Sequence, residues 1–95
     1  MPKGYILGNI SLNDADAYKP YSDRNNELLP RYGGKFLVRG GASEILEGDG
    51  RPRHVVIEFP TYADALAFYN DPDYQENLKI RQAHSEGTII VAEGV

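Results

Sequence analysis

The sequence of 95 residues predicts one α+β domain, residues 1–95, with the element order strand, helix, strand, strand, helix, strand. Apolar runs of strand length occur in four places along the chain. Two segments with helical apolar spacing and helix-start residues lie between them. No repeat, low-complexity segment or change of composition marks a second domain.

The first strand is predicted over residues 4–12 (GYILGNISL), and Asn13-Asp14 after it is a helix-start signal. Pro20 is expected in the first turn of the main helical segment, after a lead-in over residues 14–19, because proline suits the first helical position. Gly33-Gly34 is expected to end this helix. Its apolar face consists of Tyr18, Tyr21, Leu28, Leu29 and Tyr32.

The second strand is predicted over residues 35–46, with Gly40-Gly41 inside it, where a glycine pair indicates a bulge or a close backbone approach. Residues 47–53 (EGDGRPR) are rich in Gly and Pro and predict a turn. The third strand is predicted over residues 54–59. The two strands and the turn therefore form a hairpin.

The second helical region begins at Thr61, which resembles a capping box with Asp64, and its first helix extends through Tyr69. Asp71 is expected to cap a further helix, with Pro72 at its first position. Tyr74, Leu78 and Arg81 share one face of this helix, which Gly87 is expected to end. The final strand is predicted over residues 88–93.

This order is the ferredoxin-like split unit, βαββαβ, with a four-stranded antiparallel sheet. The predicted strands are apolar on both faces, as in Ile6-Leu7 and Ile89-Ile90-Val91. An antiparallel sheet with one solvated face would alternate instead, and the two helices cover only one face, so the other face needs a partner. We therefore expect a homodimer that packs sheet on sheet.

The charge, hydropathy and cysteine count of the chain argue against several classes of function. The net charge is −4 and no Lys/Arg-rich run occurs, which argues against binding to nucleic acid. No apolar run is long enough for a membrane span and no signal-peptide pattern begins the chain, so no membrane association is expected. The absence of cysteine excludes disulfides and fits a cytoplasmic location. No His/Asp/Glu spacing predicts a metal, and no glycine-rich fingerprint predicts a nucleotide cofactor.

Two charges interrupt the apolar runs of the predicted hairpin, Arg39 and Glu58. An ionised group in an apolar setting needs a partner or a function. A buried carboxylate at Glu58 would have a raised pKa and suit proton transfer, so Glu58 is the candidate catalytic residue. If the turn is centred near Gly50, Glu58 lies opposite about Ala42. The structural alternative is then an ion pair with Arg39, or with a partner chain.

Further candidates would bind a substrate. Arg39 and Arg81 suit a bidentate clamp on a carboxylate or phosphate, although Arg81 on a helix face can also extend its head to the surface. Asn9 in the first strand is a buried amide that suits substrate orientation. The tyrosines on helix faces towards the sheet suit a ligand carbonyl or proton transfer, and their alternative role is core packing: Tyr18, Tyr21, Tyr69 and Tyr74.

Four segments together resemble the bacterial family called domain of unknown function 1330, over essentially the whole chain. They are YGGKFLVRGG (32–41), LEGDGRP (46–52), VVIEFPTYADALAFYNDPDYQ (55–75) and Arg81. The family's motif positions fall here on Tyr21, Arg39, Gly40, Glu58, Phe59, Tyr69, Tyr74 and Arg81. Asn70-Asp71 departs from the family's frequent serine-like residue before the proline, but Asp71 still suits a helix cap.

The resemblance implies a dimeric α+β barrel, in which two ferredoxin-like subunits face each other through their sheets. It assigns no activity. Relatives of that superfamily include cofactor-free monooxygenases, muconolactone-type isomerases and stress-responsive domains, which hold a small ligand between sheet and helices. Three hypotheses follow: a cofactor-independent enzyme acting on an organic acid or aromatic metabolite, a non-catalytic metabolite-binding or stress-related module, and a structural Arg39–Glu58 pair.

Overall fold

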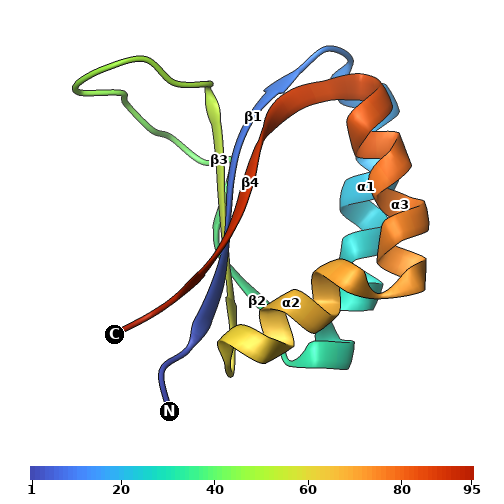
Figure 1. Cartoon of the computed structure of the whole chain (residues 1–95). Helices are drawn as coiled ribbons and strands as arrows, with labels where there is room; N and C mark the ends of the chain where they lie inside the picture. Colours follow the sequence, from blue (N-terminus) through green and yellow to red (C-terminus); the bar gives the residue numbers. More distant parts are fainter.

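The computed structural model describes residues 1–95. Its elements in chain order are β1 (Gly4–Leu12), α1 (Ala15–Leu28), the 3₁₀ turn η1 (Leu29–Tyr32), β2 (Lys35–Arg39), β3 (Arg53–Phe59), α2 (Tyr62–Asn70), α3 (Pro72–His84) and β4 (Ser85–Glu93). The strands form one antiparallel sheet in the order β2-β3-β1-β4. All three helices lie on one face of this sheet and the other face is uncovered (Figure 1). The predicted α+β class and ferredoxin-like order are confirmed.

Helix α1 begins where the sequence predicts. The Asp14 Oδ1 atom accepts a hydrogen bond from the main-chain N–H of Ala17 at 3.1 Å, which caps the helix. The expected break at Pro20 is wrong, because Pro20 lies inside one continuous helix and its ring is exposed to solvent. Gly33 ends the helical stretch after η1 with a φ of 73°, as predicted for a C-terminal glycine.

Strand β2 is shorter than predicted. It ends at Arg39 rather than at residue 46, and residues 40–52 form a loop that projects beyond the uncovered face of the sheet (Figure 1). Gly40 has a φ of 69°, which turns the chain out of the sheet, so the glycine pair ends the strand instead of lying inside it. The register shift lies earlier, between Phe36 and Val38.

The helices α2 and α3 have the predicted caps. The Thr61 Oγ1 atom accepts from the N–H of Asp64 at 3.1 Å, and Asp71 accepts from the N–H of Asp73 at 2.7 Å. Pro72 occupies the first turn of α3. Gly87 does not end this helix, which finishes at His84. A Cβ atom at Gly87 would lie 2.5 Å from the Asn9 carbonyl oxygen, so the glycine instead permits β4 to pair closely with β1, from Ser85 onwards.

The core lies between the sheet and the helices. Its fully buried members include Phe59 of β3, Phe68 of α2 and Leu28 of α1. The large apolar side chains left exposed on the strands are Leu7, Leu37, Val38 and Ile90, whose exposed fractions run from 37% to 50%. None of the helices is long and apolar enough to cross a membrane.

Candidate functional site

A cavity of about 30 Å³ lies between the sheet and the helical layer. The strands supply mostly aliphatic walls, such as Ile6 and Val55, and the helices supply Tyr18, Tyr21 and Tyr74. A buried water molecule needs roughly 10–15 Å³ of such volume. The cavity therefore holds about two water-sized groups, and a larger ligand extends beyond it or displaces side chains.

Three tyrosines form the polar part of the helical wall. The hydroxyl oxygens of Tyr21 and Tyr74 lie 2.7 Å apart in a buried hydrogen bond. The Tyr18 and Tyr21 ring centroids are 5.2 Å apart. Burial raises the pKa of Tyr74 far above its ordinary value, and the Tyr21 hydroxyl raises it further. Burial also raises the pKa of Tyr18, so these hydroxyls stay protonated near neutral pH and act as hydrogen-bond donors.

Arg81 on α3 is a buried cation beside this wall. It is only 7% exposed, and its guanidinium carbon lies 5.8 Å from the centre of the Tyr21 ring. No carboxylate forms a salt bridge with it, and its Nε atom has no hydrogen-bond partner. Most buried charges in proteins are paired. Arg81 is thus a buried cation without an acidic partner.

Arg53 is a second arginine at the cavity, and the sequence prediction missed it. Its guanidinium carbon lies 5.7 Å from the centre of the Tyr18 ring, and its Nε atom is also buried without a partner. The head group packs on Gly40, where a Cβ atom would lie within 3 Å of it. The alternation of β3 contained the signal, because Arg53 shares the helix-facing side of the strand with Val55 and Ile57.

Arg39 spans the gap between β2 and α1 at the edge of the cavity. Its guanidinium donates to the Asn26 Oδ1 atom at 3.0 Å and to the Ser22 Oγ atom at 3.0 Å. It also stacks over the Phe36 ring, 4.3 Å from the centroid. Phe36 and Arg39 both line the cavity because the register shift between them alters the alternation of β2.

Asn25 on α1 is a further polar residue in the cavity wall that sequence reasoning missed. It is 4% exposed, and its Oδ1 atom accepts from the Asn77 Nδ2 atom at 3.0 Å. Because the oxygen is engaged by Asn77, the NH₂ group is the part of Asn25 left for the cavity. The spacing of Asn25 from Tyr18 and Tyr21 on one helix face was the available signal.

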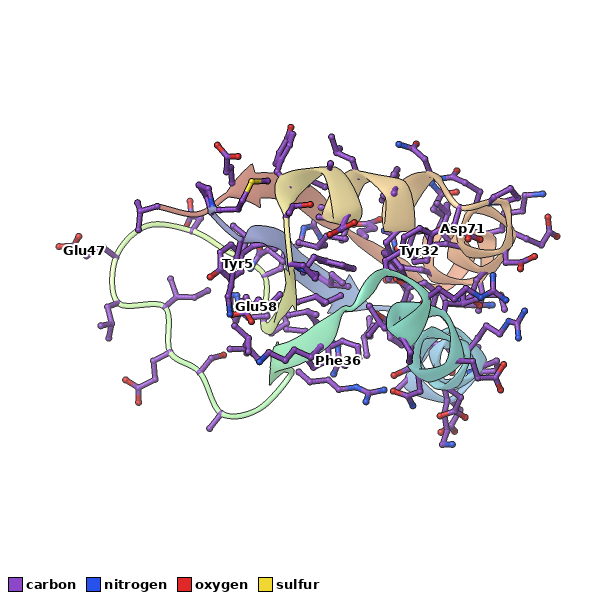
Figure 2. All side chains as sticks on the ribbon, turned by 90° about the horizontal axis from the view of Figure 1, so that it is seen from below. Tyr5, Tyr32, Phe36, Glu47, Glu58 and Asp71 are labelled. Carbon is purple, nitrogen blue, oxygen red and sulfur yellow. The ribbon has the colours of Figure 1, made fainter.

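Glu58 lies outside the cavity. Figure 2 shows Glu58 beside Tyr5, on the side of the sheet away from the helices. Its Oε1 atom is 2.9 Å from the Lys3 Nζ atom and 3.4 Å from the Lys35 Nζ atom. The hydrogen bond from Lys3 lowers the pKa of Glu58, in contrast to the raised pKa that a general base would need.

The predicted pair between Arg39 and Glu58 is not formed. Glu58 pairs across the ladder with Lys35 and not with Ala42, while Arg39 is opposite Val55 on the other face. The error follows from the position of the turn, because the loop is longer than the prediction assumed and the register is shifted. The candidate catalytic role of Glu58 stays a prediction that its position does not support.

Asn9 also faces away from the cavity. Its Oδ1 atom accepts from the Arg51 main-chain N–H at 2.9 Å, and its Nδ2 atom donates to the Arg51 carbonyl oxygen at 3.2 Å. The Nδ2 atom also lies 2.9 Å from the His54 Nδ1 atom. Asn9 thereby anchors the end of the loop 40–52 to β1.

Of the predicted binding residues, the structure brings together four. Tyr21, Tyr74 and Arg39 line the cavity and Arg81 lies directly behind the tyrosines. Tyr69 packs against Tyr74 with ring centroids 5.6 Å apart but does not line the cavity. Another tyrosine of the helical layer, Tyr32, donates to Asp71 at 2.6 Å and does not line the cavity.

Solved structures similar to this one share the ferredoxin-like fold. A protein of unknown function from Rhodopseudomonas palustris matches with a TM-score of 0.79 and 23% identity, covering 99% of this chain and 83% of that one. SnoaB, a cofactor-independent oxygenase from Streptomyces nogalater, matches with a TM-score of 0.66 and 10% identity over 97% of this chain and 92% of that one. A dimeric ferredoxin-like protein of unknown function from Thermobifida fusca matches with a TM-score of 0.63 and 16% identity, over 97% and 91%.

These identities establish the fold and no more. No curated protein matches the chain significantly. The model of one family, described as a domain of unknown function, matches residues 3–95, in agreement with the resemblance read from the motifs. The chain therefore belongs to the DUF1330 family.

Proposed function

We propose that the protein is a homodimeric binding protein that holds one small organic metabolite in the cavity of each subunit. The observation that carries this proposal is the cavity itself. It is lined mainly by apolar and aromatic side chains and has a few convergent polar groups, from Tyr21, Tyr74, Asn25 and Arg53. This composition is typical of small-molecule sites.

The chemistry of the wall favours binding over proton abstraction. The buried tyrosines hold their protons, since burial raises the pKa of Tyr74 and of Tyr18. Glu58, the carboxylate that the sequence suggested as a base, lies on the opposite face of the sheet. The cavity is therefore built to donate hydrogen bonds to a ligand and holds no side chain suited to remove a proton from carbon at neutral pH.

The experiment that tests binding is a thermal-shift screen with small carboxylic acids, amides and phenols, combined with a cavity-filling variant. Gly8 lines the cavity, and a Cβ atom there would meet its neighbours at 3.4 to 3.5 Å, which is ordinary contact. Gly8→Ala therefore fills part of the cavity without strain. We expect ligands to raise the melting temperature of the native protein in a saturable way, and Gly8→Ala to weaken that response.

Gly41→Ala is the matched control, because a Cβ atom at Gly41 meets nothing within 4 Å. This variant should respond to ligands as the native protein does. If no compound in the screen stabilises the native protein, or if Gly8→Ala responds equally, the cavity is not the binding site.

The dimer belongs to the same proposal. Apolar side chains of the strands remain exposed on the sheet face that the helices leave uncovered, including Leu7 and Ile90. A similar structure is described as a dimeric ferredoxin-like protein. A second copy of the chain, packed sheet on sheet, covers this face most simply.

A second candidate function is a cofactor-independent oxygenase or isomerase. The observation that favours it is the pair of Tyr21 and Tyr74 hydroxyls at 2.7 Å, which suits an enolate oxygen, together with the fold shared with SnoaB. Its test is oxygen uptake and product analysis with every ligand that the screen identifies. Turnover that is lost in the Tyr74→Phe variant supports this candidate, and bound ligand recovered unchanged in air excludes it for that ligand.

A further inference from the structure

Several hydrogen-bonding groups in the cavity wall, and Arg81 beside it, are available as donors. The Nε–H groups of Arg53 and Arg81 have no partner. Asn25 presents its NH₂ group, since Asn77 engages the oxygen. In the pair of hydroxyls at Tyr21 and Tyr74 one proton makes the shared hydrogen bond and the other remains to be donated. No Asp or Glu lines the cavity.

A surplus of buried donors requires an acceptor. Leaving a donor unsatisfied in the interior is unfavourable, and leaving a cation unpaired there is more so. Arg81 is such an unpaired cation, because it is only 7% exposed and no carboxylate forms a salt bridge with it. Its guanidinium carbon lies 5.8 Å from the centre of the Tyr21 ring, beside the paired hydroxyls. Arg53 adds a second positive charge at the cavity wall.

A second subunit cannot supply the missing acceptor. The face open to a partner is the far side of the sheet, whereas Arg81 lies on α3 in the helical layer (Figure 1). Two acidic groups of the same helical region are engaged elsewhere, since Asp71 accepts from Tyr32 and Asp73 accepts from Arg31. A ligand that carries an anionic acceptor would supply the missing partner.

The size and shape of the cavity narrow the class of that ligand. A volume of about 30 Å³ admits a planar group of about three heavy atoms more readily than a tetrahedral phosphate with four oxygens. Planar guanidinium groups also match a carboxylate in geometry. The rest of the molecule would leave between β2 and α1, where the Arg39 side chain, hydrogen-bonded to Ser22, would have to move aside.

We infer, on the basis of the proposed binding function, that the metabolite is an organic monocarboxylate whose carboxylate enters the cavity. There it accepts hydrogen bonds from Arg53, Asn25 and the tyrosine hydroxyls, and Arg81 supplies the neutralising charge behind them. The organic part extends past Arg39 at the sheet edge. Arg81 is thus a specificity-determining residue, which selects acids over their neutral isosteres.

The test compares acids with matched amides. Propionate and benzoate are titrated against propionamide and benzamide at constant ionic strength, with phosphate and sulfate as tetrahedral anions. Binding is followed by the Nε–H resonances of Arg53 and Arg81 and by thermal shift. We expect both acids to bind at least about 10-fold more tightly than their amides and than phosphate, because charge-assisted hydrogen bonds exceed neutral ones.

Variants assign this selectivity to the arginine. Arg81→Gln should weaken the binding of the acids by about 10- to 100-fold and abolish the preference for acid over amide. Arg24→Gln removes the same charge from an exposed site, where Arg24 pairs with Glu27. This variant should leave the affinity for the acids and the preference for acid over amide unchanged. Arg53→Gln serves as a second variant if Arg81→Gln does not fold. The comparison of acids with amides in the native protein tests the inference without any variant.

The outcomes separate the two proposals. If the amides bind as tightly as the acids, or Arg81→Gln keeps the preference, the carboxylate inference is overturned and the cavity remains a binding site. If phosphate binds more tightly than propionate and benzoate, the ligand is a tetrahedral anion and the inference is likewise overturned. If no acid, amide or phosphate binds at all, both the inference and the proposed function are contradicted.

Discussion

Arg81 and Glu58 are both charged side chains with little exposure, yet their surroundings differ. Glu58 has two lysines within 3.4 Å, and its side chain is 14% exposed. Arg81 has the Tyr21 ring beside it and no acidic partner. An ion pair at the edge of a sheet face needs no function to explain it, whereas an unpaired buried cation does. Arg81 is therefore a stronger candidate for a functional residue than Glu58.

The unpaired state of Arg81 predicts an unusual stability effect. In the absence of ligand, Arg81→Met should stabilise the protein by about 1 kcal/mol, because replacing a buried charge by an apolar side chain of similar length removes a desolvation penalty. Urea unfolding of both proteins in ligand-free buffer measures this difference. A loss of several kcal/mol instead would identify Arg81 as a structural brace.

Glu58 predicts a pH-dependent stability. The hydrogen bond from Lys3, with a further contribution from Lys35, lowers the pKa of Glu58 in the folded state below 4.5. A carboxyl group with a lowered pKa stabilises the fold fully above its unfolded-state pKa, and this contribution is lost as the pH falls through the folded-state pKa. Glu58→Gln should therefore be less stable than the native protein at pH 7 and equally stable near pH 2, as measured by urea unfolding.

The control for this measurement is Glu76→Gln. Glu76 pairs with Lys79, but their side chains are 77% and 69% exposed, so the pair contributes little. A difference at pH 7 that persists unchanged near pH 2 for Glu58→Gln would contradict the role of the ionised carboxylate.

Most of the individual site residues were visible in the sequence as unusual charges or helix-face tyrosines, but their grouping was not. A single register shift between Phe36 and Val38 decides that Arg39 faces the helices while Glu58 faces away. The sequence pattern indicates which residues are anomalous, because burial of a charge is costly. It does not indicate which face they occupy, because one bulge reverses the alternation.

At the scale of elements, the helix starts were predictable and the ends were less so. Asp14, Thr61 and Asp71 cap their helices through local hydrogen bonds that depend only on neighbouring residues. Gly87 was misinterpreted because its role depends on β1, which is distant in sequence. Strand β2 was predicted too long because the hairpin length depends on where the loop 40–52 leaves the sheet.

Pro20 offers a test at this scale. Inside a helix a proline forfeits one main-chain hydrogen bond at a cost of about 3 kcal/mol, while it restricts the unfolded chain by up to about 1 kcal/mol. Pro20→Ala should therefore stabilise the protein by about 2 kcal/mol, since the ring of Pro20 is exposed and little packing is lost. Thermal unfolding followed by circular dichroism measures the change, and a destabilised variant would show that the helix accommodates the proline without penalty.

At the scale of the whole molecule, the fold has one helix-covered face and one bare face. A chain of 95 residues buries a limited share of its surface alone, which makes a second subunit a natural way to complete the core. The cavity and the proposed dimer face lie on opposite sides of the same sheet (Figure 1). Ligand binding and dimerisation should therefore be separable by mutation.

The dimer is tested by a charge on the bare face. Ile90→Glu should shift the protein from dimer to monomer in sedimentation velocity, because a carboxylate would be buried between the two sheets. Tyr62→Glu adds the same charge on α2, at a residue that is 38% exposed, and should leave the dimer intact. A native protein that sediments as a monomer at micromolar concentration would contradict the proposed assembly.

The hydrogen bonds of Asn9 bear on the tautomer of His54 beside it. Because Arg51 engages both the oxygen and the nitrogen of the Asn9 amide, the orientation of that amide is settled, and its NH₂ group faces the His54 Nδ1 atom. An NH₂ group only donates, so Nδ1 carries a lone pair and the imidazole hydrogen resides on Nε2. The Asn9 amide therefore joins the base of the loop 40–52 to β1 and to the imidazole of β3 through hydrogen bonds.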